Sequence, residues 1–377
     1  MQQSGDVNHY TRTARVALQT HATIQLLQAF AAAQMPAIVF KGLALRERVY
    51  ITPEQRVASD VDLLVRRVDW ERADALLVSL GYAVSPDEYD WTADFAREFM
   101  GETPYRKGAM VIDLHWELTA MSWFRATTAF DLDGLWVRAV PTEIAGAPAL
   151  RLCPEDEILH LCYHTAVHHG LAHPHGYRDI LGVLRVERDT LDWSVLAERA
   201  REWRVSVAVW AALKVARGRM QEARSKKQEA RIKNQESRIE KRAISDQQPA
   251  TSNANHTTHN PQPTTHNPED DLIPEAALDA LRVPRWRQRL LQPFVRRAMT
   301  GEAALVSGTM RFLGVLLVDR VWDLPGVVLR GLFPGRRWLQ LRYDLSPRQA
   351  FWRQFTYPLQ VLAHGTGAFL RSVIRHS

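Results

Sequence analysis

The chain has 377 residues, of which 46% are hydrophobic and 24% charged, a composition that excludes a fibrous or wholly disordered protein and allows a sizeable core. Its formal net charge of +6 fits a partner that carries phosphate, whether a nucleotide, a nucleic acid or an anionic membrane. Only two cysteines occur, Cys153 and Cys162, which excludes a disulfide framework and predicts a cytoplasmic location.

The first 50 residues predict a helix, a short strand and a second helix. Residues 11–34 carry apolar side chains at helical spacing, and residues 37–40 predict a buried strand. Lys41-Gly42 follows, where this strand turns into a helix over 43–50. Glycine lets the backbone approach a phosphate, and a helix N-terminus offers free N–H groups to it. Lys41 can reach the same anion, or it can be an ordinary surface lysine.

The next strand follows a loop and carries two carboxylates. Arg56, in the loop, is a candidate for a bidentate contact with phosphate or for an ion pair with a nearby carboxylate. Residues 61–65 predict a short buried strand. Because side chains alternate along a strand, Asp60 and Asp62 project from the same face. Carboxylates this close repel each other unless a cation lies between them, and Mg²⁺ is the cation that prefers such oxygens. A strand end or a turn is the structural alternative for this pair.

A third carboxylate, Asp113, lies in the apolar run 109–116, which follows a predicted hairpin turn at Lys107-Gly108. If this strand lies beside the first, three carboxylates meet. That arrangement suits two-metal transfer, in which one ion activates the acceptor oxygen and the other neutralises the triphosphate. His115 shares the face of Asp113, so it can contact a phosphate, orient Asp113, or be a hydrogen-bonded histidine at a strand end.

These motifs together resemble the uncharacterised bacterial nucleotidyltransferase family within the DNA polymerase beta superfamily. The part around Lys41 and Asp62 is also similar to nucleotidyltransferase toxins of the abortive-infection type. The resemblance covers residues 10–215 and resumes weakly after residue 272. The residues that carry it are Phe40-Lys41-Gly42, Tyr50, Arg56-x-x-Ser59-Asp60-x-Asp62-Leu63-Leu64-Val65, Gly81-Tyr82 and Ile112-Asp113-Leu114-His115-Trp116.

The resemblance implies an α+β fold, with a small mixed-sheet nucleotidyltransferase core flanked by helices and followed by an α-helical domain. It implies an enzyme that moves a nucleoside monophosphate from an NTP such as ATP to a hydroxyl acceptor and releases pyrophosphate. The implied cofactor is Mg²⁺, with Mn²⁺ as the alternative. Where the superfamily usually has Gly-Ser at the opening of its site, this chain has Lys41-Gly42-Leu43.

The resemblance also assigns roles to individual residues. It implies that Asp60 and Asp62 bind both metals, and that Asp113 binds the catalytic metal and helps to deprotonate the acceptor. The candidate nucleotide-binding residues are Lys41, Gly42, Arg56, Ser59 and His115. The acceptor can be a small molecule, RNA or a protein side chain.

From residue 154 onward the pattern changes to helix. A helix that begins at Pro154 places several histidines at four-residue steps along one face, and more follow: His160, His164, His168, His169, His173 and His175. This stripe can bind a transition metal, line the cleft toward the nucleotide, or simply pack. We expect Arg178 and Asp179, in the next helix, to form a buried pair.

We expect four parts: residues 1–150 as the catalytic domain, 151–219 as the first part of a helical domain, 220–270 as a low-complexity insertion, and 271–377 as the helical continuation with a basic C-terminal region. The insertion begins with a seven-residue repeat typical of a solvated helix or of disorder. It ends in an Asn-, Thr- and Pro-rich run that cannot bury a core.

The C-terminal part mixes arginines with apolar side chains, and no run in the chain predicts a transmembrane segment. This part can pack on the rest of the protein, contact an anionic membrane or hold RNA. Two alternatives to the enzyme therefore stay open: a non-catalytic nucleotide-binding or interaction module, and a membrane-surface adaptor.

Overall fold

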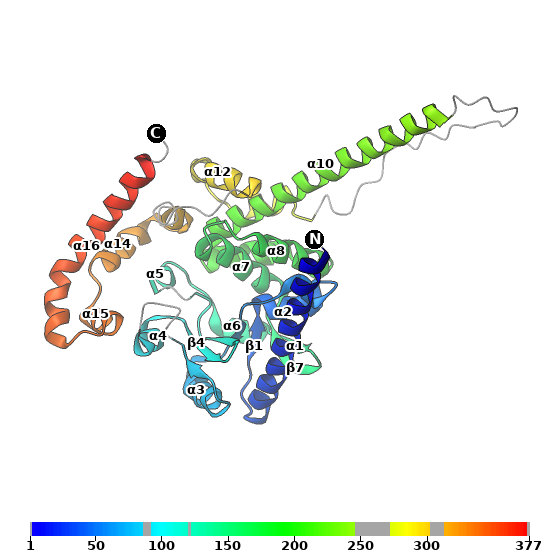
Figure 1. Cartoon of the computed structure of the whole chain (residues 1–377). Coiled ribbons are helices and arrows are strands. Elements are labelled where there is room, and N and C mark those ends of the chain that lie inside the picture. Colours follow the sequence, from blue (N-terminus) through cyan, green and yellow to red (C-terminus); the bar gives the residue numbers. More distant parts are fainter. Residues whose placement is uncertain (1, 86–91, 120–121, 246–271, 302–312, 375–377) are drawn as a thin grey trace, which may run out of the picture.

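The computed structural model describes residues 2–85, 92–119, 122–245, 272–301 and 313–374. A mixed sheet of seven strands, in the order β3-β4-β5-β2-β1-β7-β6, forms its centre (Figure 1). The strands are β1 (Ile38–Phe40), β2 (Val61–Leu64), β3 (Ala83–Val84), β4 (Glu102–Lys107), β5 (Met110–His115), β6 (Val140–Ile144) and β7 (Ala147–Arg151).

Helices cover the sheet and make up the rest of the described chain. Those of the first half are α1 (Gln2–Ala32), α2 (Lys41–Val49), α3 (Trp70–Ser79), α4 (Ala93–Phe99), α5 (Ser122–Arg125) and α6 (Leu132–Arg138). Those of the second half are α7 (Pro154–Tyr163), α8 (Pro174–Val186), α9 (Trp193–Glu202), α10 (Ser206–Ser245), α11 (Glu275–Ala280), α12 (Arg285–Thr300), α14 (Leu324–Leu332), α15 (Arg336–Tyr343) and α16 (Pro347–Ile374). The predicted α+β fold, with a helical part after the sheet, is confirmed.

Side chains alternate along each strand, so the two faces of the sheet pack into two hydrophobic cores. Val61 and Leu63 of β2 pack in one core with α1 and α3, whereas Leu64 packs in the other with α7, α8 and α10. Asp62 points to the second side, toward the helices of the second half. Figure 1 shows α7 and α8 stacked over this side of the sheet, whereas α1 packs on the other side. The acidic side chains therefore lie at the junction between the sheet and the helical part.

The strand register brings the acidic residues together. β2 and β5 are parallel neighbours, and Asp62 lies directly beside Asp113. β4 and β5 form the predicted hairpin, in which Gly108 has a left-handed φ of 58° and Glu102 lies opposite His115. The prediction that the two carboxylate strands are neighbours is confirmed.

The hairpin of β6 and β7 was not predicted. Its turn residues, Ala145 and Gly146, both have positive φ, as a two-residue hairpin turn requires, but Ala-Gly is a weak signal for such a turn. Its strands are only partly buried, so their hydrophobic pattern is also weak. The hairpin pairs with β1 through a parallel contact between Ile38 and Leu150 and closes that edge of the sheet.

Helix α10 shows which alternative the seven-residue repeat adopts. Its beginning lies among the other helices and the rest extends away from them (Figure 1). The side chains of residues 221–235 are almost all exposed. The repeat is thus helical up to Ser245, with solvated side chains over residues 221–235. The low-complexity run 247–268 lies outside the described residues, and the division into four parts remains a prediction.

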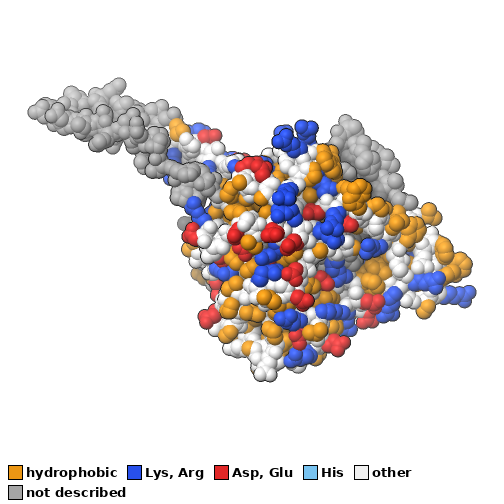
Figure 2. Space-filling model, turned by 180° about the vertical axis from the view of Figure 1, so that it is seen from behind, with side chains coloured by type: hydrophobic (Ala, Val, Ile, Leu, Met, Phe, Trp, Pro, Cys, Tyr) orange, Lys and Arg blue, Asp and Glu red, His pale blue; other side chains and the backbone are white. Residues whose placement is uncertain are grey.

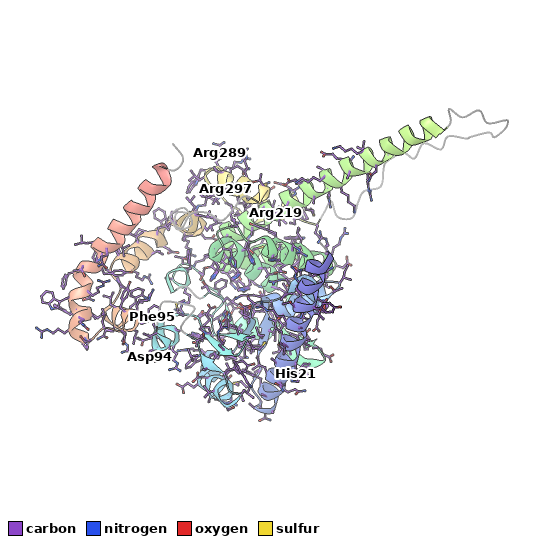
Figure 3. The ribbon with its side chains drawn as sticks, in the orientation of Figure 1. His21, Asp94, Phe95, Arg219, Arg289 and Arg297 are labelled. Carbon is purple, nitrogen blue, oxygen red and sulfur yellow. The ribbon has the colours of Figure 1, made fainter. Side chains whose placement is uncertain are left out.

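The C-terminal helices contact the first half of the chain through α4. Thr92 Oγ1 donates to the carbonyl of Leu341 at 2.7 Å, and the rings of Phe95 and Trp338 meet edge to face at 5.4 Å. Figure 3 shows Phe95 on α4 beside α15. No helix in the described ranges has the length and apolar character that crossing a bilayer needs.

Because the side chains of residues 226–235 are exposed, replacing residues 226–270 with a Gly-Ser linker should change the thermal unfolding midpoint by less than about 4 °C. The comparison variant is Trp210→Ala in the buried half of α10, where Trp210 is 3% exposed. That substitution should cost about 3–5 kcal/mol. Loss of folded protein on replacing 226–270 would show that this segment stabilises the core.

Candidate active site

Three carboxylates meet above β2 and β5. Asp62 and Asp113 are 3% and 9% exposed, and both line a cavity of about 290 Å³ together with Asp60. Asp60 comes just before β2 and is half-buried. It accepts a hydrogen bond from Ser59 Oγ at 2.9 Å. The structure thus brings together the three carboxylates that the sequence singled out.

Lys41 is the cation closest to these carboxylates. Its Nζ donates to Asp62 Oδ1 at 2.6 Å. Burial alone would lower the pKa of Lys41, but Asp62 and Glu102 raise it above its ordinary value, so the ammonium stays charged. Burial likewise opposes ionisation of Asp62, yet Lys41 and His115 together hold the pKa of Asp62 below its ordinary value.

The pKa of Asp113 is shifted in the opposite direction to that of Asp62. Burial raises the pKa of Asp113 well above its ordinary value, and the negative charges of Glu102, Asp62 and Asp60 raise it further. Burial and Asp62 also raise the pKa of Asp60. The site therefore contains more negative charge than Lys41 neutralises, which is the electrostatic condition for binding a cation.

His115 lies between two carboxylates. Its Nε2 is 3.0 Å from Asp62 Oδ1, in a hydrogen bond whose direction depends on the tautomer. Its Nδ1 is 3.0 Å from Glu102 Oε2, without the alignment of a hydrogen bond. The ring of Phe40 meets the imidazole edge to face at 4.9 Å. His115 is 2% exposed and orients Asp62 more directly than Asp113.

Sequence reasoning missed Glu102, although the signal was present. Counting back from the predicted turn at Lys107-Gly108 pairs Met110 with Lys107 and, five residues further along each strand, His115 with Glu102. Glu102 lines the same cavity as the three aspartates and adds a fourth carboxylate to the site.

Lys41 and Gly42 shape the start of α2. Lys41 has a φ of 55°, a left-handed conformation that costs a side-chain-bearing residue about 1–3 kcal/mol. Gly42 is needed for space, because a Cβ there would lie 3.2 Å from Arg56 Nη2 and 3.3 Å from Ala58 Cβ. This tight junction holds Lys41 over β2 and places Gly42 in the cavity lining.

Arg56 is already paired within the protein. Its Nε and Nη2 donate to Asp179 Oδ1 and Oδ2 at 3.0 and 2.9 Å, and Tyr50 Oη donates to the same carboxylate. The expected pair of Arg178 with Asp179 is wrong, since residues one apart on a helix do not face each other. Arg178 instead lies over the Tyr50 ring, 5.7 Å from its centroid. The guanidinium of Arg56 still lines the cavity.

A histidine wall, formed by His164, His168, His169 and His173, lines the opposite side of the cavity. A π-helical turn over His164–His168 continues α7, and the rings of those two residues stack at 4.8 Å. His169 and His173 stack at 4.1 Å. His160, the first histidine of the stripe, does not line the cavity. It is 1% exposed and packs edge to face against the ring of Phe40.

The histidine wall is uncharged near neutral pH. Burial and the charge of Lys41 lower the pKa of His164 well below its ordinary value, and burial with His173 lowers that of His169 to about 3. His164 Nε2 and His169 Nε2 lie 3.0 Å apart. Within the described chain, however, the group of three metal-binding side chains with ligand atoms within 4.8 Å of one another is Asp62, Asp113 and His115.

The raised pKa of Asp113 predicts a pH-dependent gain in stability for Asp113→Asn. A carboxyl with a higher pKa in the folded than in the unfolded chain stabilises the fold below its unfolded pKa, and that contribution is lost as the pH rises through its folded pKa. Without metal, Asp113→Asn should therefore unfold at a higher temperature than wild type at pH 8, with a smaller difference at pH 5. Exposed Asp133→Asn is the control. A lower midpoint for Asp113→Asn at pH 8 would contradict this account.

Comparisons with known proteins identify a family for more than half of the chain. The model of a family described as uncharacterised nucleotidyltransferase matches residues 7–221. A similar solved structure is the crystal structure of ANT(2'')-Ia in complex with adenylyl-2''-tobramycin, at 17% identity over 49% of this chain and 97% of that chain, with a TM-score of 0.34. Another is the solution structure of the antibiotic-resistance factor ANT(2'')-Ia, at 17% identity over 49% and 91%, with a TM-score of 0.33. No curated protein matches. Because the family model spans more than half of the sequence, the chain belongs to the uncharacterised nucleotidyltransferase family, a family of transferases.

Proposed function

We propose that this protein is a Mg²⁺-dependent nucleotidyltransferase that moves a nucleoside monophosphate from an NTP, ATP included, to a hydroxyl acceptor and releases pyrophosphate. The observation that supports this most strongly is the gathering of Asp60, Asp62 and Asp113 in one cavity. Family membership supports the reaction class. The free, buried Cys153 and Cys162 fit the proposed cytoplasmic location.

The residues present suit a hard divalent cation. Asp62 and Asp113 offer carboxylate oxygens from neighbouring strands, and Asp60 adds another at the cavity rim. Oxygen ligands favour Mg²⁺ or Mn²⁺, whereas imidazole suits softer metals. We therefore assign His115 to orienting Asp62. When bound, the ions supply polarisation of the reacting phosphate and neutralisation of the leaving pyrophosphate.

Asp113 is the group that accepts the proton of the acceptor hydroxyl. Its carboxylate lines the cavity beside Asp62, and a positioned carboxylate can act as a general base. The proton moves from the hydroxyl oxygen to a carboxylate oxygen of Asp113 as that hydroxyl oxygen bonds to the α-phosphorus. The bond from this phosphorus to the pyrophosphate oxygen breaks, so the leaving group carries away the electron pair.

The triphosphate is proposed to bind beside Lys41. The ammonium of Lys41 and the first N–H groups of α2, at Gly42, offer positive charge and donors at one end of the cavity. Ser59 lies at its rim, where the hydroxyl that now donates to Asp60 can turn to a phosphate oxygen. Asp179 fixes the orientation of Arg56, which contributes its positive charge from the cavity wall.

The acceptor hydroxyl enters from the histidine wall. Neutral imidazoles donate and accept hydrogen bonds without competing for the metal charge, which suits a hydroxyl-bearing molecule. Small molecules, RNA and protein side chains all carry such a group, so transfer of label in a cell extract identifies the acceptor class.

Substituting Asp62 with Asn should lower turnover by at least about 10³-fold, because it removes a metal-binding charge. The measurement incubates the full-length protein with each α-labelled NTP, Mg²⁺ and a cell extract, and follows label on RNA, protein and small molecules. Asp94→Asn, an exposed carboxylate on α4, is the matched control and should retain full activity (Figure 3).

Two results would contradict the proposal. Full transfer by Asp62→Asn would show that this carboxylate does not bind the metal. Nucleotide binding without transfer, by wild type and variant alike, would instead support the non-catalytic module. Removing Mg²⁺ with a chelator should abolish transfer by the wild-type protein.

A further inference from the structure

The C-terminal helices expose an unusual amount of apolar surface. Of the twenty large hydrophobic side chains exposed in the described chain, ten lie between Val315 and Leu359. We call the most exposed of these, with three arginines among them, the C-terminal face: Trp322, Val328, Leu329, Phe333, Trp352, Phe355, Leu359, Arg330, Arg336 and Arg348. Figure 2 shows hydrophobic side chains gathered among Lys and Arg on the side of the molecule where these helices lie.

Helix α16 has apolar side chains on two faces, of which the protein buries one. Ala350 and Tyr357 are buried in a small cluster with Leu339 of α15. Trp352, Phe355 and Leu359, spaced three and four residues apart, form another stripe and are 61%, 62% and 68% exposed. Packing against the rest of this chain therefore accounts for one face only.

All three polar members of the C-terminal face are arginines. In the described part of the chain, Arg330 and Arg348 have no carboxylate partner, and Arg336 donates to Gln354 Oε1 at 3.1 Å. Arg348 precedes Trp352 by one helical turn and thus joins the exposed stripe of α16. The acidic Asp319 is not available to them, because it accepts hydrogen bonds from the backbone N–H groups of Ser206 and Val207.

We propose that the C-terminal face docks on an anionic phospholipid bilayer. An apolar stripe lined by cationic residues lies in the plane of a membrane, with tryptophans at the headgroup level and arginines on the lipid phosphates. The helices need only lie on the bilayer, which agrees with the lack of a described helix able to cross it. The positive charge of the face is opposite to the negative charge of the lipid surface. Each basic residue near that surface adds attraction that salt weakens.

Two other occupants fit the C-terminal face less well. A second copy related by twofold symmetry would bring the arginines of one face against those of the other, a like-charge contact that destabilises an interface. Single-stranded nucleic acid stacks on aromatic rings, but Val328, Leu329 and Leu359 offer no ring for stacking. Hydrocarbon is the environment that suits both the aliphatic and the aromatic members.

The test is co-sedimentation of the full-length protein with vesicles of phosphatidylcholine, alone or mixed with phosphatidylglycerol. Wild type should bind the anionic vesicles at about 0.1 M salt, and at least tenfold more weakly at about 1 M salt or to neutral vesicles. Trp352→Ser/Phe355→Ser/Leu359→Ser should weaken binding at least tenfold. Arg330→Gln/Arg348→Gln should weaken it about ten- to thirtyfold at low salt.

The matched control is Arg285→Gln/Arg289→Gln on α12, which removes the same charge outside the C-terminal face and should change binding less than about threefold. If this control lost as much vesicle binding as Arg330→Gln/Arg348→Gln, binding would depend on the overall positive charge and not on the C-terminal face. That result would overturn the proposal. Absence of vesicle binding by the wild-type protein would also overturn the proposal. In that case, dimers that the triple variant does not form, or binding of RNA, would identify the other occupant of the face. If the triple variant does not fold, the test is the fluorescence of the wild-type tryptophans with vesicles of brominated lipid. Quenching is expected, and a lack of quenching would contradict docking.

Discussion

The site depends on one electrostatic constraint: Asp60, Asp62, Glu102 and Asp113 line one cavity, and Lys41 is the one lysine among the described residues that line it. Removing charges from water costs several kcal/mol per ion unless a partner compensates. Lys41 compensates most directly for Asp62, through the 2.6 Å contact, and its left-handed backbone is part of the cost of reaching that position. The raised pKa of Asp113 records the charge that is left uncompensated. A bound cation and a bound triphosphate would remove this imbalance together.

Buried ion pairs fix the helical part against the sheet and so shape the cavity. Arg48 of α2 contacts Glu157 of α7 and Glu187 at the end of α8. Arg56 contacts Asp179 of α8 at 2.9 Å. Each pair joins the segment between β1 and β2 to the helices that carry or adjoin the histidine wall. These ion pairs therefore help to set the width of the cavity, and losing one partner would leave a buried charge.

The sequence predicted the part of the site that depends on strand alternation and short turns. Asp60, Asp62 and Asp113 were found because β2 and β5 are buried strands, and the turn at Gly108 fixed the second of them. The ion pairs of Arg56 and Arg48 were not predictable, because their partners lie more than a hundred residues away and no local pattern selects among distant carboxylates. The β6–β7 hairpin was missed because half-exposed strands and an Ala-Gly turn leave little pattern to detect.

The most direct test of the central claim is a crystal structure of the full-length protein with Mn²⁺ and a non-hydrolysable NTP analogue, with Mn²⁺ located by its anomalous scattering. The account predicts a peak within about 2.4 Å of carboxylate oxygens of Asp62 and Asp113. It also predicts that Lys41 Nζ has moved from Asp62 to a phosphate oxygen. A peak at His164 and His169 with none at the aspartates, or a nucleotide bound away from Lys41, would contradict it.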